Sequence, residues 1–268
     1  MNKILSYFNY YKPGVGQSLG LLGWMLVGSL IGNGLELLIR MAFGIDAAME
    51  YGLLFSYPCV FIPAIVYAAL RSRRNRLAGD EGVEVDWHGF PGFRMGIEAI
   101  LVTIAVGYIV DPLQMLLPEP PEWLKSMLDS VVKGNIVINL ICASVMAPVF
   151  EEWFCRGMIM RGLMANGKSA WFAIIVSSLV FAFIHLNPWQ AIPAFLLGCL
   201  FGFVYYRTGS LKITMLMHCA NNTLAIVVSR IDLFNGADHW YDFFGPTAFW
   251  IIFAVLLVFF GFFIKNYR

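Results

Sequence analysis

The chain has 268 residues, of which 59% are hydrophobic and only 13% are charged. Soluble globular proteins are about 45–50% apolar and about 25% charged, so this composition excludes an ordinary soluble domain and indicates lipid as the solvent. The formal net charge of +1, with no basic tract, gives no reason to expect nucleic acid as a partner. We therefore expect an integral membrane protein.

Residues 1–14 contain two lysines, but polar and aromatic residues interrupt any short apolar run, and no small-residue cleavage site follows. We expect this segment to be a retained cytoplasmic tail and not a signal peptide.

Eight segments contain the roughly 20 mostly apolar residues that a membrane-spanning helix needs. In chain order they are residues 18–41, 49–70, 94–117, 135–164, 169–187, 189–207, 211–230 and 245–265. The fourth is too long for a simple span. The sequence predicts an all-α, polytopic bundle of about eight transmembrane helices that forms one domain over residues 1–268.

Eight spans place both termini on the same side of the membrane. In that arrangement 14 of the 18 lysines and arginines lie on the side of the termini and 4 lie on the other side. Because cytoplasmic loops are enriched in Lys and Arg, the count predicts that both termini are cytoplasmic.

Ionisable residues interrupt the fourth predicted span. Each costs roughly 2.5–3.5 kcal/mol inside a bilayer, so a cluster of them indicates a functional site. Glu152 and Arg156 are four residues apart and can pair on one helix face. Glu151 points about 100° away and has no local cation. Glu151 is therefore the carboxylate that we expect to act as a general base.

The fifth and seventh predicted spans add further polar side chains. His185 ends the fifth, while His218 and Asn222 share one face of the seventh. A neutral imidazole can bind a metal or a water molecule, and an Asn amide can donate to a developing oxyanion. One such group taken alone is most often a structural hydrogen-bonding residue. Polar groups in several neighbouring spans favour a functional cluster.

The depths of these residues can be compared from the helical rise. If the chain turns near Gly167, Glu151 lies ~24 Å and His185 ~27 Å from the turn, so the two can meet in an antiparallel hairpin. A full-length sixth span would nevertheless carry residues 186–190, and His185 with them, to the outer face. Either the fifth and sixth spans are tilted, or their hairpin stays buried.

Three motifs in this region resemble those of a known family. Glu-Glu-x-x-x-Arg at 151–156, Phe-x-x-x-His at 181–185 and His-x-x-x-Asn at 218–222 are similar to the motifs of the CAAX-protease and bacteriocin-processing intramembrane endopeptidases, relatives of the type II CAAX prenyl proteases. The resemblance covers about residues 140–225, inside a motif-bearing core of about 135–230. The first three spans and the last carry no motif.

The resemblance implies roles for six residues. Glu151 would activate water, with His185 as a second base or a metal ligand. His218 and Asn222 would stabilise the oxyanion, and Glu152 and Arg156 would support the site. Glu151, His185 and His218 would also make a three-ligand zinc site with an open position. The motifs leave a metal-dependent and a glutamate-dependent protease open, and no His-Glu-x-x-His helix is present.

The resulting hypothesis is an intramembrane endopeptidase, in the bilayer of a bacterial inner membrane, that cuts a membrane-anchored or lipidated protein or peptide. The alternative is a non-catalytic immunity or scaffold protein that keeps the polar cluster for folding. A transporter with a carboxylate proton relay is disfavoured, because the first three spans carry no pattern that matches the later ones.

Overall fold

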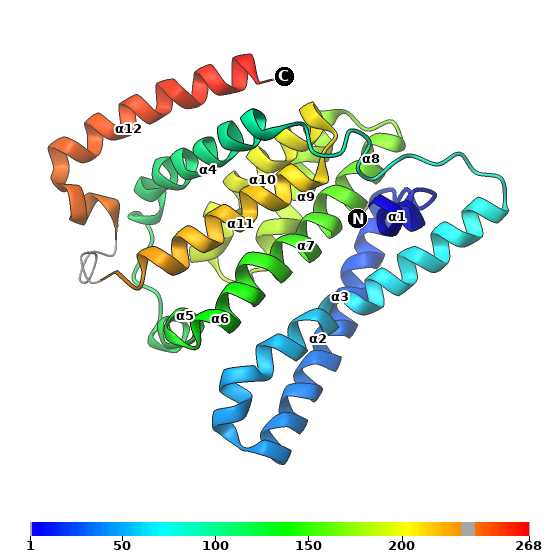
Figure 1. The fold of residues 1–268 in the computed structure, drawn as a ribbon, viewed down its shortest axis with the longest axis horizontal. Helices are drawn as coiled ribbons and strands as arrows, with labels where there is room; N and C mark the ends of the chain where they lie inside the picture. Colours follow the sequence, from blue (N-terminus) through cyan, green and yellow to red (C-terminus); the bar gives the residue numbers. More distant parts are fainter. Residues whose placement is uncertain (1, 232–238, 268) are drawn as a thin grey trace.

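The computed structural model describes residues 2–231 and 239–267, and within these ranges it is helical with no β-strand (Figure 1). The predicted all-α, polytopic fold class is confirmed. The helices are α1 (Asn2–Leu5), the 3-10 helix η1 (Ser6–Phe8), α2 (Val15–Phe43), α3 (Ile45–Leu77), α4 (Phe93–Gln114), α5 (Glu122–Lys133), α6 (Ile136–Asn139), the π-helix η2 (Leu140–Met146), α7 (Ala147–Glu152), the π-helix η3 (Trp153–Met160), α8 (Arg161–Ala165), α9 (Ala170–Phe183), α10 (Pro188–Thr208), α11 (Leu211–Val228) and α12 (Trp240–Asn266).

Seven helical stretches in the described residues are long and apolar enough to cross a membrane, namely α2, α3, α4, the continuous run 136–165, α10, α11 and α12. The protein is therefore an integral, multi-pass membrane protein. The cytoplasmic placement of the termini stays a prediction.

The fifth expected span, residues 169–187, is shorter than predicted. Its helix α9 has 14 residues, which corresponds to ~21 Å and falls short of the ~30 Å hydrocarbon core. It ends early because the Asn187 side chain caps α10 by accepting from the Gln190 amide, and Pro188 occupies the first turn of that helix. His185 consequently lies in the α9–α10 turn and not in a helix.

The run 136–165, α9, α10 and α11 form a central group, and the other helices surround it. α2 and α3 form a long hairpin beside it, and α12 lies against α4 on the opposite side (Figure 1). The hairpin is tight because Gly28 of α2 faces backbone carbonyls of α3, where a Cβ would collide. The run 136–165, α9, α10 and α11 contact one another in the centre, and this group carries every residue of the three motifs.

A buried guanidinium closes one end of this central group. Arg161, one of the 14 cations counted on the side of the termini, is only 1% exposed. Its nitrogens donate to five backbone carbonyls, those of Phe8, Asn9, Tyr11, Val83 and Gly157. The side chain thereby ties the N-terminal segment and the 78–92 loop to the start of α8.

We expect Arg161→Met to lower the free energy of unfolding by at least ~3 kcal/mol, because several buried carbonyls would lose their donor at about 1–3 kcal/mol each. Chemical denaturation in detergent micelles would measure the loss. Arg94→Met is the matched control, since the Arg94 side chain is 91% exposed and its ion pair with Glu98 is worth at most ~1 kcal/mol. Equal effects of the two substitutions would contradict this role for Arg161.

Candidate active site

The two adjacent glutamates end the short helix α7, between two π-helical segments. Pro148 lies in the first turn of α7, η2 precedes it and η3 follows it. A π-helix inserts an extra residue per turn and is often found at functional sites. Glu151 is 8% exposed and Glu152 is fully buried, so this irregular helix carries two carboxylates in the interior.

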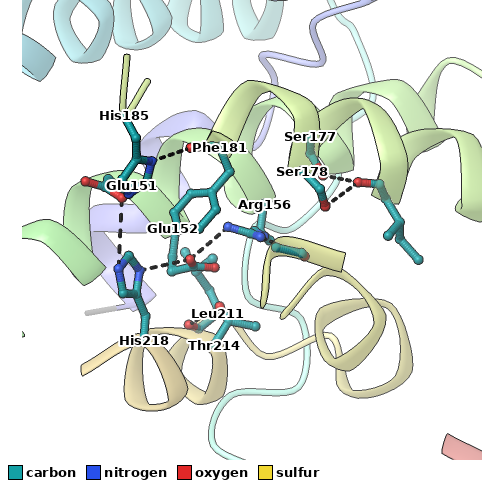
Figure 2. Close-up of polar contacts among 12 residues, drawn as sticks. Glu151, Glu152, Arg156, Ser177, Ser178, Phe181, His185, Leu211, Thr214 and His218 are labelled. Carbon is teal, nitrogen blue, oxygen red and sulfur yellow. Dashed lines mark hydrogen bonds and ion pairs between the residues drawn. The ribbon is translucent and has the colours of Figure 1, made fainter. Parts of the chain in front are cut away.

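Glu152 is held by two donors from different helices (Figure 2). Its Oε1 accepts from Arg156 Nη1 at 2.8 Å and from His218 Nδ1 at 3.2 Å. The pairing of Glu152 with Arg156 that the four-residue spacing predicts is thus present, and both side chains are completely buried. The contact with His218 was not predicted, and it links the run 136–165 to α11.

Arg156 extends this network to α9 and α10. Its Nη2 donates to the Gly198 carbonyl at 2.8 Å, and its guanidinium lies 4.7 Å from the centre of the Phe181 ring. A Cβ on Gly198 would be 3.2 Å from Arg156 Nη2 and 3.1 Å from Ser178 Cβ, so the close approach needs glycine. Arg156 therefore touches three of the central helices.

His218 is 4% exposed and lies between the two carboxylates. Because a carboxylate only accepts hydrogen bonds, Nδ1 carries the hydrogen that points to Glu152. The other nitrogen, Nε2, lies 4.0 Å from Glu151 Oε2. That separation is too long for a direct hydrogen bond and is of the kind that a water molecule bridges. The Phe181 and Phe201 rings pack on the imidazole at centroid distances of 5.3 and 5.7 Å.

Glu151 has a partner that the sequence analysis missed. Tyr57 of α3 donates its hydroxyl to Glu151 Oε1 at 2.5 Å, while Oε2 is buried and accepts no hydrogen bond from the described residues. No motif lies in the first three spans, and the only local signal was a tyrosine beside Pro58 in an apolar helix. Tyr57 leaves Glu151 with one bound and one unbound oxygen.

His185 and Asn222 are each held by a backbone carbonyl. His185 Nδ1 donates to the Phe181 carbonyl at 2.8 Å, and within the described part of the chain His185 makes no hydrogen bond to either glutamate. Asn222 Nδ2 donates to the Ala143 carbonyl of η2 at 2.7 Å. The structure thus joins Glu152, Arg156 and His218 directly and places Glu151 4.0 Å from His218. His185 and Asn222 lie on the adjoining turn and helix.

The expected zinc ligands do not form a group with metal-binding spacing. Among the residues that the structure describes, no set of three or more His, Cys, Asp or Glu side chains is arranged to hold a metal ion. The zinc site of Glu151, His185 and His218 stays a prediction, and we derive no step from a metal.

Comparisons with known proteins concern the same part of the chain. Residues 133–224 match the family described as "Type II CAAX prenyl endopeptidase Rce1-like". The Bacillus subtilis (strain 168) protein described as "Putative membrane peptidase YdiL" is 25% identical over 93 residues, which cover 35% of this chain and 38% of that relative. No solved structure matches. The family resemblance seen in the motifs is confirmed for residues 133–224, which contain the motif-bearing helices of the central group.

The buried pair can be tested with a double-mutant cycle on unfolding free energy. Glu152→Gln and Arg156→Gln should each cost about 3–5 kcal/mol, because each leaves a buried charge without its partner. The double variant should cost clearly less than the sum, as contacting residues do.

Arg94 and Glu98 supply a matched control, as a second Arg–Glu pair with four-residue spacing whose side chains are 91% and 39% exposed. Their coupling should not exceed ~0.5 kcal/mol. Additive costs at residues 152 and 156 would show that the buried groups do not depend on each other.

Proposed function

Because residues 133–224 match the family described as "Type II CAAX prenyl endopeptidase Rce1-like", we propose that the protein is an intramembrane endopeptidase. Its substrate class is a membrane-anchored or lipidated protein or peptide, cut within the bilayer of a bacterial inner membrane. The observation that carries the proposal is the unbound Glu151 Oε2, 4.0 Å from His218 Nε2 in a buried site.

In this mechanism a water molecule lies between Glu151 Oε2 and His218. Glu151 takes a proton from the water as its oxygen attacks the carbonyl carbon of the scissile bond. Tyr57 keeps Oε1 occupied, so Oε2 is the basic atom. Glu151 then gives the proton to the departing amine, and His185 assists this transfer through Nε2, the nitrogen that Phe181 leaves unbound.

The oxyanion of the tetrahedral intermediate needs donors in the same space. His218 in its doubly protonated form holds Glu152 through Nδ1 and donates to the oxyanion from Nε2. One N–H of the Asn222 amide is used by Ala143, and the second is the further donor.

We expect Glu151→Gln to lower peptide cleavage by about 10²–10⁴-fold, the usual contribution of a general base, while the fold is retained. The variant keeps the Tyr57 hydrogen bond and removes the base. Comparison of new peptide termini in membranes of cells that express the native or variant chain would measure cleavage and identify substrates.

Glu98→Gln is the matched control, because Glu98 is a half-exposed glutamate of α4 outside the site. Unchanged cleavage in the Glu151 variant would support the non-catalytic scaffold or immunity role instead. Metal content and chelator sensitivity of the purified protein, measured on the same substrate, separate the glutamate-dependent from the metal-dependent form of the mechanism.

Tyr57→Phe should lower kcat by about 10-fold with little change in KM, because a hydrogen bond to a charged group is worth about 1.5–3 kcal/mol. Tyr57 positions the base and does not touch the substrate in this mechanism. Tyr67→Phe, a tyrosine further along α3, controls for general effects on that helix. A change in KM alone would contradict a positioning role.

A further inference from the structure

A cavity lies outside the candidate active site, between α4, α11 and α12. Its volume is about 930 Å³, within the range of ligand-binding sites. Its walls are mostly apolar, with contributions from Leu101, Leu224 and Leu256 on the three helices. Val255, which also lines it, is 62% exposed, so the cavity opens to the surface of a membrane-spanning helix. Acyl chains of the bilayer are therefore its natural neighbours.

One end of this cavity contains an unsatisfied carboxylate. Asp111 is 5% exposed, and its Oδ1 is 3.0 Å from His239 Nδ1. Its Oδ2 is buried and has no hydrogen-bond partner among the described residues. A buried carboxylate oxygen without a donor is costly, so such an atom points to a ligand that supplies one. Among the described residues that line the cavity, Asp111 and His239 are the ones with acidic or basic side chains, so the ligand that Asp111 favours is cationic.

Three aromatic rings surround the same end. Tyr108 precedes Asp111 by one helical turn, and Trp240 follows His239 directly. The rings of Tyr108, Trp240 and Phe244 lie 6.1 Å from one another, centre to centre, and all three line the cavity. Aromatic faces attract ammonium groups, and rings beside a carboxylate are a recurring way to bind them.

We propose that this cavity binds a phospholipid with a primary ammonium headgroup, that is, a phosphatidylethanolamine. The ammonium would donate to Asp111 Oδ2 and lie against the aromatic rings, while an acyl chain would fill the apolar part. Asp111 is three residues from the end of α4, or ~5 Å along the helix. That depth is where a spanning helix meets the headgroup layer. Phosphatidylglycerol offers Asp111 only neutral hydroxyl donors and has no cation to lie against the rings.

The cavity also borders the candidate active site through α11. Asn221 lines the cavity, and its Nδ2 donates to Asn222 Oδ1 at 3.1 Å. A lipid in the cavity would pack against Asn221 from the side that faces away from the candidate active site. Through the hydrogen bond between the two residues it would restrain the Asn222 amide, which we assign to the oxyanion. The lipid is thus placed to influence the site without entering it.

The test is native mass spectrometry of the full-length protein, released from micelles containing phosphatidylethanolamine and phosphatidylglycerol with identical acyl chains. We expect about 10-fold preferential retention of phosphatidylethanolamine, as one charge-assisted hydrogen bond provides. Asp111→Asn should abolish the preference. Glu119→Gln, an exposed carboxylate in the loop after α4, should leave it unchanged. Equal retention of the two lipids by the native chain would overturn the proposal.

A second variant keeps the proposal testable if Asp111→Asn does not fold. A Cβ on Gly107 would meet only Asn221 Oδ1, at 4.0 Å, so the side chain of Gly107→Leu would enter the cavity. It should lose the retained lipid while unfolding at the same denaturant concentration as the native chain. Undiminished retention would contradict the assigned site. The readout is lipid retention, so its outcome is independent of whether the protein cleaves peptides.

Discussion

The buried carboxylate of Glu152 is the interaction on which the central group of helices depends. One oxygen of this side chain accepts from Arg156 and from His218, and Arg156 reaches onward to the carbonyl of Gly198. Glu152, Arg156 and His218 are all buried, so the loss of any one of these contacts would leave a buried polar group without a partner. The network therefore fixes how the run 136–165, α10 and α11 lie against one another, and it sets the orientation of the His218 ring.

Two adjacent glutamates become chemically different through this arrangement. Glu152 is fixed by an arginine and a histidine, and Glu151 by a single tyrosine hydroxyl. A carboxylate that is already paired makes a poor base, whereas one with a free oxygen can accept a proton. The difference arises because consecutive residues of a helix point about 100° apart, so that neighbours in the sequence meet different helices. A structural support and a candidate base thus arise from one dipeptide.

Sequence reasoning succeeded where contacts are local in the chain. Apolar runs located the spanning helices, and four-residue spacing predicted the pair of Glu152 with Arg156. It failed where contacts join distant segments. Tyr57 is 94 residues from Glu151 and carries no motif, so nothing in its neighbourhood indicated the hydrogen bond. The burial of Arg161 was missed for a related reason, since its five partners are backbone carbonyls and leave no pattern of side chains.

The end of α9 shows a different kind of failure. Periodicity extended the fifth span through His185, although Asn187 and Pro188 form a local start signal for the next helix. The signal was present but was outweighed by the apolar run before it. Because α9 ends early, His185 lies in a turn. Asn187 also holds the backbone of this turn, since its side chain donates to the His185 carbonyl at 2.8 Å. The sequence analysis could not bring His185 close to Glu151 and also keep the sixth span at full length. That difficulty arose because α9 was given the length of a complete span.

Helix α11 connects the two polar regions of the molecule. His218 and Asn222 lie on one face, toward the glutamates and η2, and Asn221 lies on the neighbouring face, toward the cavity. Asn221 and Asn222 are joined by a side-chain hydrogen bond, so neither amide can rotate freely without breaking it. The loss of a hydrogen-bond partner in a largely buried position is costly for either amide. The orientation of Asn222 is therefore set both by η2 and by whatever fills the space beside Asn221, which makes the lipid-facing cavity part of the surroundings of the candidate active site.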